Sequence, residues 1–335
     1  MARVFYDKDA NYGVLKDQTV AVVGYGNQGR SQALNMRDSG LHVIVGNEDD
    51  SYAARAKADG MSVFDVAQAA AQANVIMMLV PDEVQSELYD ASIAPGLKEG
   101  SCLVFSHGYN IFYGLISPPK TVDVVLVAPR MIGEGVRRCF ESGGGFPTVV
   151  GVHQDSTGKA WARTLALAKA IGGSRMGAWE STFEEETVID LFDEQVGGGS
   201  TLLSTIYSFE TLVDAGYNPE VVLLELYASG ELAEVFRGVA RYGLLESLRM
   251  HSRTSQYGQM SRAPRLVHPE GKETLRAILD DIRSGAFAKE WGEERKSGYA
   301  HMEQLRSQYG AHPMFRAERR VKEALRSEEN TDQAE

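Results

Sequence analysis

The chain has 335 residues, of which 43% are hydrophobic, so it is long enough for two domains with their own cores. Its formal net charge is −12 at pH 7, and Lys and Arg are nowhere dense enough to follow a phosphate backbone, which argues against a nucleic-acid partner. The N-terminal sequence lacks the apolar segment of a signal peptide, and no apolar run is long enough to span a membrane. The two cysteines, Cys102 and Cys139, fit a reduced compartment, so we expect a cytoplasmic protein with no membrane partner.

The first predicted elements are a short buried strand at residues 20–23 and a helix at residues 31–38, with a glycine-rich turn between them. The turn has the spacing Gly24-x-Gly26-x-x-Gly29. Gly24 permits the tight turn, Gly26 lets a pyrophosphate approach the backbone, and Gly29 lets the helix close on the strand. The N-terminus of the helix then offers free N–H groups to phosphates. Glycine turns also close ordinary strand–helix units, but the strand before and the helix after favour a dinucleotide site.

From this turn to about residue 177, short apolar runs alternate with helical patterns. Continuous apolar strands separated by helices predict an α/β domain with a parallel, doubly wound sheet, which we place at residues 1–181. The further predicted strands are residues 42–45, 75–80, 101–105, 122–127 and 148–152, and the predicted helices between them include residues 66–73, 83–91 and 157–170.

Three predicted loops at the carboxyl ends of strands carry polar residues, namely VPDE at 80–83, SHGYN at 106–110 and APR at 128–130. In an open sheet, ligands bind outside the carboxyl ends of the strands. Taken alone, Asp82 could simply cap a helix and His107 could simply satisfy a turn. Because the three loops share one edge of the sheet, we favour a common site.

The loop after the second strand bears on the choice of cofactor. Its sequence at residues 47–52 is NEDDSY, with three consecutive carboxylates and no cation before Arg55. An acidic residue here hydrogen-bonds the adenosine ribose, whereas a 2′-phosphate needs Arg or Lys. Two unit charges about 5 Å apart repel by roughly 3 kcal/mol at an effective dielectric constant of about 20. A solvated acidic loop is the alternative interpretation, but we expect NADH to be preferred over NADPH.

From residue 182 the strand pattern ends, and helical periodicity predicts an all-α domain at residues 182–326. Gly216 ends one of its helices. A lone extended piece is predicted at residues 264–267. The acidic tail at residues 327–335 is predicted to be disordered.

An acidic helix opens this half of the chain, with the sequence EEETVIDLFDEQ at residues 184–195. Asp190 and Glu194 are four residues apart, so both carboxylates project from one face of a helix, and Asp193 adds a third nearby. Hard cations such as Mg²⁺ take such oxygen ligands. A helix that carries carboxylates for solvation alone has the same appearance, so the spacing leaves both interpretations open.

Longer segments resemble the ketol-acid reductoisomerase family, in its short class with a single knotted domain. The resemblance covers nearly the whole chain. It rests on VAVVGYGNQG (20–29), VIMMLVPDEVQ (75–85), SHGYNI (106–111), VAP before Arg130 (127–129), VHQDSTG (152–158), FEEETVIDLFDEQ (183–195), FETLVDAGYNPE (209–220), QYG (256–258) and AILDDIRSGAFAKEW (277–291).

The resemblance implies a Rossmann domain followed by a knotted helical domain. Two helical domains pair to build each active site, so it also implies a homodimer or a higher homo-oligomer. In the family, two Mg²⁺ ions hold a 2-acetohydroxy acid while an alkyl group shifts between carbons. NAD(P)H then reduces the resulting 2-keto acid to a 2,3-dihydroxy acid in valine and isoleucine biosynthesis.

Carried over by motif, the resemblance assigns roles to individual residues. Asp190 would bridge the metals, Glu194 would bind one of them, and Glu225 would begin the second metal-binding helix. The expected catalytic residues are His107, Arg130, Asp190, Glu194, Glu225 and Ser252, the last on the substrate carboxylate, and the expected metal ligands are Asp190, Glu194, Glu225 and Glu231. The expected cofactor-binding residues are Gly24, Tyr25, Gly26, Asn27, Gln28, Gly29, Asn47, Glu48, Ser51, Pro81, Asp82 and Gly133.

The chain departs from the family pattern around the metals and the substrate. The family has a second glutamate four residues after the position of Glu225, where this chain has Ser229. Glu231 could replace that ligand only if the helix is interrupted, which Gly230 permits. Arg130 stands at the place of the family's active-site lysine, and an arginine stays charged and exchanges protons poorly. We therefore expect one Mg²⁺ site and doubt the second.

These departures leave the glycine turn intact. We expect an NAD(P)H-dependent oxidoreductase, re-purposed to reduce a 2-keto acid, a ketol acid or an imine. One alternative is a genuine Mg²⁺-dependent ketol-acid reductoisomerase that converts 2-acetolactate to 2,3-dihydroxy-isovalerate. The other is a catalytically inactive dimer that only binds the cofactor.

Overall fold

The computed structural model describes residues 1–329 and divides into two compact units, Met1–Asp190 and Leu191–Glu335. The first unit extends past the predicted boundary at residue 181 and includes most of helix α8 (Phe183–Asp193), because Phe183 packs into its core. Residues 327–329 of the predicted tail close helix α17 (Met314–Glu329), and residues 330–335 lie outside the described residues.

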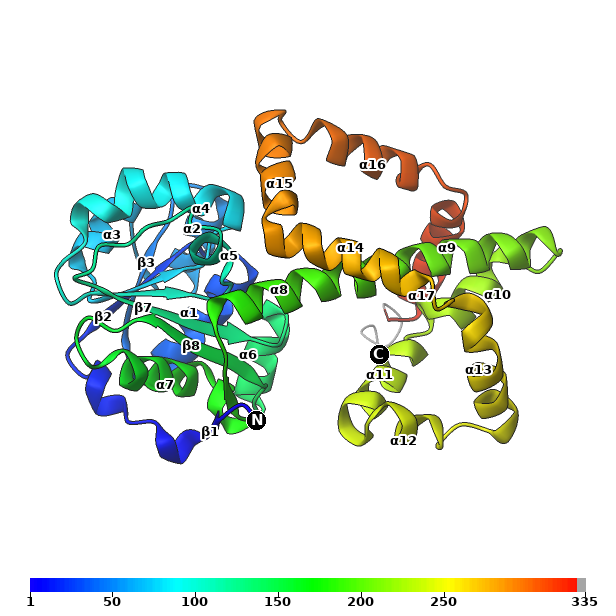
Figure 1. Ribbon diagram of the computed structural model, residues 1–335, viewed down its shortest axis with the longest axis horizontal. Helices are drawn as coiled ribbons and strands as arrows, with labels where there is room; N and C mark the ends of the chain where they lie inside the picture. The colour runs from blue at the N-terminus through cyan, green and yellow to red at the C-terminus, as the bar shows by residue number, and fades with distance from the viewer. Residues whose placement is uncertain (330–335) are drawn as a thin grey trace. The chain divides into compact units, whose positions relative to one another are not determined.

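Within residues 1–329, nine strands form one sheet in the order β1-β9-β8-β7-β6-β5-β2-β3-β4 (Figure 1). The six strands from β4 to β7 in this order are parallel, which confirms the predicted core. The sheet is mixed beyond them, because β8 runs antiparallel to β7 and β1 antiparallel to β9. The strands are β1 (Val4–Phe5), β2 (Thr19–Val23), β3 (His42–Gly46), β4 (Ser62–Phe64), β5 (Val75–Met78), β6 (Cys102–Phe105), β7 (Asp123–Pro129), β8 (Thr148–Gln154) and β9 (Ala178–Glu180).

Helices cover both faces of the sheet (Figure 1). Successive residues of a strand point to opposite faces, so Val20 and Val22 join the core under α1, α6 and α7, whereas Ala21 and Val23 join the core under α3. The central positions of the parallel strands are apolar because each face meets a helical layer. The helices of this unit before α8 are α1 (Asn27–Asp38), α2 (Ser51–Ala58), α3 (Val66–Gln72), α4 (Asp82–Leu88), α5 (Tyr109–Phe112), α6 (Gly133–Glu141) and α7 (Ala160–Ile171).

A buried ion pair ties α7 to the sheet. Asp123, at the start of β7, has a fully buried side chain, and its Oδ2 accepts a hydrogen bond of 2.8 Å from Nη1 of Arg163. Its Oδ1 accepts from the backbone N–H groups of Ser156 and Thr157 at 2.9 and 3.0 Å. The carboxylate therefore has a donor at both oxygens, which is what a buried charge requires.

In its described residues, the second unit contains helices and no strand, which agrees with the predicted all-α domain. Its small core joins α9, α10 and α17 through side chains such as Phe209, Leu223 and Val321. No helix in residues 1–329 is long and apolar enough to cross a bilayer. The knotted path and the dimer stay predictions. The elements are η6 (Glu194–Gly198), α9 (Gly199–Asp214), α10 (Pro219–Leu223), η7 (Leu224–Ala228), α11 (Glu231–Tyr242), α12 (Leu244–Leu248), α13 (Arg253–Leu266), α14 (Gly271–Ser284), α15 (Ala286–Lys296), α16 (Ala300–Gly310) and α17.

The prediction of an extended piece at residues 264–267 is wrong. Pro264 lies inside α13, and only Val267, which follows the helix, has extended dihedral angles. Proline removes a backbone donor but fixes a φ close to the helical value. In the last turn of a helix it therefore costs one hydrogen bond and need not end the helix where it stands.

We predict that Arg163→Met lowers the free energy of unfolding by about 3–5 kcal/mol, because it leaves the buried carboxylate of Asp123 without its cation. Denaturant unfolding followed by circular dichroism measures the change. Lys57→Met is the control, since it breaks an exposed pair with Asp49 and should cost less than about 1 kcal/mol. Equal losses in the two variants would contradict this account.

Candidate functional site

The turn between β2 and α1 has the geometry that its glycine spacing predicts. Gly24 has a φ of +93°, and a Cβ added there would lie 2.7 Å from Cγ1 of Val80. A Cβ on Gly29 would lie 1.9 Å from the carbonyl oxygen of Gly24, so α1 closes directly on the turn. A Cβ on Gly26 would meet no atom of the described residues within 4 Å. The backbone is therefore open at the N-terminus of α1, which fits the pyrophosphate of a dinucleotide.

In the loop after β3, some polar side chains form hydrogen bonds to the glycine turn and others are exposed to solvent. Oδ1 of Asn47 accepts from the backbone N–H of Tyr25 at 3.1 Å, and its Nδ2 donates to Oδ1 of Asp50 at 2.9 Å. Asp50 in turn caps α2. Asn47, predicted to bind the cofactor, thus holds the turn in place, whereas Glu48 and Ser51 of the same loop are exposed.

The start of α6 packs against the start of α1. A Cβ on Gly133 would lie 2.2 Å from the carbonyl oxygen of Asn27, and Nε2 of Gln28 donates to the carbonyl oxygen of Met131 at 2.8 Å. Three of the residues predicted to bind the cofactor, Asn27, Gln28 and Gly133, therefore lie together beside the glycine turn. Their contact with a cofactor stays a prediction.

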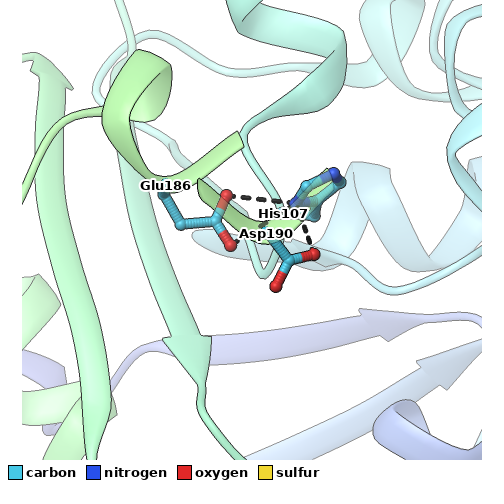
Figure 2. Close-up of side chains that lie close together, drawn as sticks. All are labelled: His107, Glu186 and Asp190. Atoms are coloured by element: carbon cyan, nitrogen blue, oxygen red, sulfur yellow. Dashed lines mark hydrogen bonds and ion pairs between the residues drawn. The ribbon is translucent and has the colours of Figure 1, made fainter. Parts of the chain in front are cut away.

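A cluster of charged side chains lies at the carboxyl ends of β6 and β7, against the start of α8. Figure 2 shows three of them, His107, Glu186 and Asp190, pointing toward one another. Nδ1 of His107 lies 3.1 Å from Oε2 of Glu186 and 3.7 Å from Oδ2 of Asp190. The side chain of Glu186 is completely buried. The structure thus brings the predicted residues His107 and Asp190 together around a carboxylate that was not predicted.

Arg130, directly after β7, joins two of these carboxylates. Its Nη2 donates to Oε1 of Glu186 at 2.6 Å, and its Nη1 donates to Oδ1 of Asp190 at 2.7 Å. The backbone N–H of Gly108 donates to Oε2 of Glu186 at 2.7 Å. Both oxygens of Glu186 therefore have charged or backbone donors, which compensates for its burial.

The pKa values of the cluster follow from burial opposed by these contacts. Burial alone would lower the pKa of His107, but the hydrogen bond and charge of Glu186, with the charges of Asp82 and Asp190, raise it to about 9. Burial alone would raise the pKa of Glu186, yet His107 and Arg130 hold it below its ordinary value. His107 and Glu186 therefore form an imidazolium–carboxylate pair at neutral pH.

Asp82 belongs to the same cluster. Pro81 precedes it as the cap residue of α4, and Oδ2 of Asp82 lies 3.8 Å from Nε2 of His107. Burial raises the pKa of Asp82 to about 6, although the charge of His107 opposes the rise. The structure places its carboxyl group beside the imidazole, and the contact of Asp82 with a cofactor stays a prediction.

The donor set raises the question of a metal. One ligand atom from each of His107, Glu186 and Asp190 lies within 4.8 Å of the other two, and this is the one such group in the described residues. The guanidinium of Arg130 already bonds both carboxylates. A divalent ion about 4 Å from that unit charge would meet a repulsion of roughly 8 kcal/mol at an effective dielectric constant of about 20, which offsets part of its attraction to the two carboxylates. One oxygen of each carboxylate is already bonded by the guanidinium, so with Arg130 in this place the residues of the first unit do not form a free divalent-metal site.

The remaining predicted site residues belong to the second unit. Glu194 opens the π-helical turn η6, Glu225 lies in the π-helical turn η7, and Oγ of Ser252 caps α13 by accepting from the N–H of Ser255 at 3.2 Å. Gly230 has a φ of +81° and separates η7 from Glu231, the first residue of α11. The helix is thus interrupted where Gly230 permits it. The grouping of these carboxylates with Asp190 around a metal stays a prediction.

Glu186 is the site residue that the sequence analysis missed. It stands four residues before Asp190, just as Glu194 stands four residues after it, so all three share one helical face by spacing. That spacing was the available signal. The spacing alone does not single out Glu186, because a helix that carries carboxylates is usually solvated.

We predict that alanine at one glycine of the turn lowers stability, whereas alanine at another weakens dinucleotide binding. Gly29→Ala should lower the free energy of unfolding by about 1–3 kcal/mol or more, because its Cβ meets backbone. Gly26→Ala should leave the free energy of unfolding within about 0.5 kcal/mol and weaken dinucleotide binding tenfold or more, because its Cβ enters the open side. Thermal melting and a fluorescence titration with NADH measure the two effects. Tight NADH binding by Gly26→Ala would show that the pyrophosphate lies elsewhere.

A second prediction concerns the charge of His107. Glu186→Gln should lower the pKa of the imidazole by roughly one to three, because the carboxylate that favours the protonated ring is gone. An NMR titration of the His107 ring, from about pH 5 to pH 10, measures the change. Glu184→Gln, which changes an exposed residue of the same helix, should leave the titration as it is. An unchanged midpoint in Glu186→Gln would assign the raised pKa to another cause.

Comparisons with known proteins agree with this architecture. Residues 14–177 match the family model "Acetohydroxy acid isomeroreductase, NADPH-binding domain", and residues 183–327 match "Ketol-acid reductoisomerase, C-terminal domain". The chain is 44% identical over 327 residues to a ketol-acid reductoisomerase (NADP(+)) of Methanopyrus kandleri, covering 97% of this chain and 99% of the other. It is 43% identical over 323 residues to one of Leptospira biflexa, covering 94% and 95%.

A solved structure is similar over the same length. The NADH-preferring ketol-acid reductoisomerase from an uncultured archean superposes with a TM-score of 0.92 at 35% identity, covering 96% of this chain and 98% of the other. The chain therefore belongs to the ketol-acid reductoisomerase family and is an NAD(P)H-dependent oxidoreductase of that type.

Proposed function

We propose that this family member is an NADH-dependent reductase of a 2-keto acid, a ketol acid or an imine, and that it does not catalyse the alkyl shift. The interruption at Gly230 carries the proposal. The family's shift uses two metal ions, and the family pattern supplies for them a second glutamate four residues after the position of Glu225, on the same face of a helix. Here Ser229 takes the place of the second glutamate, and a left-handed residue removes Glu231 from the face of the preceding helix.

Hydride transfer makes smaller demands on the site. Bound NADH supplies the hydride. Nδ1 of His107 faces Glu186, and with a pKa of about 9 the ring carries a second proton at Nε2. His107 can give that proton to the carbonyl oxygen or imine nitrogen as the double bond is reduced, so that C=O, NADH and one proton become CH–OH and NAD⁺. The charge of Arg130 stabilises the developing oxyanion.

The preference for NADH rests on the loop after β3. Glu48 is exposed beside the glycine turn, and its neighbours Asp49 and Asp50 are also acidic, so a 2′-phosphate would meet like charges. The similar solved structure is described as NADH-preferring, whereas the relatives of M. kandleri and L. biflexa carry NADP(+) in their names. The acidic loop favours the first of these.

The apolar surface of the second unit supports a homodimer or a higher homo-oligomer. Large side chains such as Phe236, Leu244 and Leu266 are 63%, 77% and 80% exposed in the single chain. Apolar groups in this number are costly in water, and the core of this unit in its described residues is small. A second copy of the chain, in the cytoplasm, is the partner that we propose.

The full reductoisomerase reaction is the second candidate. The 44% identity to a named ketol-acid reductoisomerase over 97% of the chain favours it. In that case the carboxylates Glu194, Glu225 and Glu231 would complete a metal site with Asp190.

The two candidates differ in their substrates. We predict turnover of 3-hydroxy-3-methyl-2-oxobutanoate, which needs reduction only, and none of 2-acetolactate, which must rearrange first. NADH oxidation at 340 nm, with Mg²⁺ and with chelator, measures both. Turnover of 2-acetolactate would overturn the proposed function in favour of the second candidate. If NADH is not oxidised with either compound or with any other small keto acid or imine, the protein would be a catalytically inactive cofactor-binding dimer.

The cofactor preference is tested at one residue. Glu48→Arg should raise the ratio of kcat/KM with NADPH to that with NADH by tenfold or more, because it replaces repulsion of the 2′-phosphate by attraction. Glu99→Arg reverses an exposed charge at the opposite edge of the sheet and should leave the ratio unchanged. A wild-type enzyme that turns over NADPH faster than NADH would refute the preference.

A further inference from the structure

We propose that the guanidinium of Arg130 takes the place of a divalent cation between Glu186 and Asp190, so that this site performs hydride transfer without a metal. This inference rests on the proposed reductase function and adds its cofactor requirement. It departs from the metal dependence that the family resemblance implies.

The first support is the way in which the two carboxylates share one cation. Glu186 and Asp190 lie on successive turns of α8, and separate nitrogens of one guanidinium bond them at 2.6 and 2.7 Å. Like charges four residues apart on a helix repel each other, so a cation between them is stabilising. Arg130 supplies that cation from a different element, at the end of β7.

The second support is burial. The side chain of Glu186 has no exposed surface, and that of Asp190 is 31% exposed. A buried carboxylate persists only with a charged partner in good geometry, and each oxygen of Glu186 has one within 3.1 Å. The buried charge of Glu186 is therefore compensated without an added ion.

The third support is the choice of arginine at the place of the family's lysine. A guanidinium is planar and presents several donors in a fixed fork, so it can span two carboxylates at once. A lysine ammonium is a compact point charge. It would leave part of one carboxylate free for a metal. The substitution thus changes how many oxygen atoms of the cluster remain available as ligands.

The test measures two properties of the full-length protein, its affinity for a metal ion and the dependence of NADH oxidation on a metal ion. Mn²⁺ is the probe, and electron paramagnetic resonance measures its free concentration without any substrate or cofactor. In the wild type we expect NADH oxidation with 3-hydroxy-3-methyl-2-oxobutanoate to change less than twofold between Mg²⁺ and EDTA. We expect Arg130→Lys to bind Mn²⁺ at least tenfold more tightly than the wild type.

Two variants control for folding and for charge. Arg130→Gln removes the cation while keeping a side chain of similar length, and it should also gain Mn²⁺ binding. Arg37→Lys alters an exposed arginine paired with Asp38, and it should bind Mn²⁺ as the wild type does. Melting temperatures identify a variant that has lost its fold.

The inference fails if the wild type binds Mn²⁺ and Asp190→Asn weakens that binding tenfold, or if EDTA abolishes the reduction. Its failure is distinct from that of the proposed function. Turnover of 2-acetolactate would overturn the function whatever the metal titration shows. If no substrate is reduced, the Mn²⁺ titration alone still decides whether Arg130 excludes the metal.

Discussion

The buried carboxylate of Glu186 is the constraint on which the candidate site depends. It has donors from two loops, the backbone N–H of Gly108 and the ring of His107 after β6, and the guanidinium of Arg130 after β7. Losing any one of these would leave part of a buried charge without compensation. One side chain of α8 therefore fixes two loops of the sheet edge, and the position and charge of His107 follow from it.

Much of the fold could be predicted, and the errors have physical reasons. Six strands were predicted because a strand buried on both faces is apolar at every position. The strands β1, β4 and β9 were missed because each has only two or three residues, too few to show a pattern. The antiparallel direction of β8 could not be predicted, since an apolar run has the same composition in either direction.

The site was predicted where residue type alone sets the geometry. The roles of Gly24, Gly26 and Gly29 follow from the absence of a Cβ, and the structure has the turn that they require. Glu186 was missed because burial of a carboxylate depends on donors more than fifty residues away in the chain. The hydrogen bond that Asn47 accepts from the backbone N–H of Tyr25 could not be predicted either, because a sequence does not show which polar groups are partners.

The packing of α6 on α1 joins the glycine turn to the segment that carries Arg130. Gly133 admits no side chain against the first residue of α1, Gln28 bonds the carbonyl oxygen of Met131, and Met131 is the next residue after Arg130. The first turn of α1 is therefore bonded to the residue that directly follows Arg130. Four consecutive residues, Arg130 to Gly133, thus contain both the guanidinium that bonds Glu186 and Asp190 and the glycine that packs against the start of α1, so the position of one restricts the position of the other.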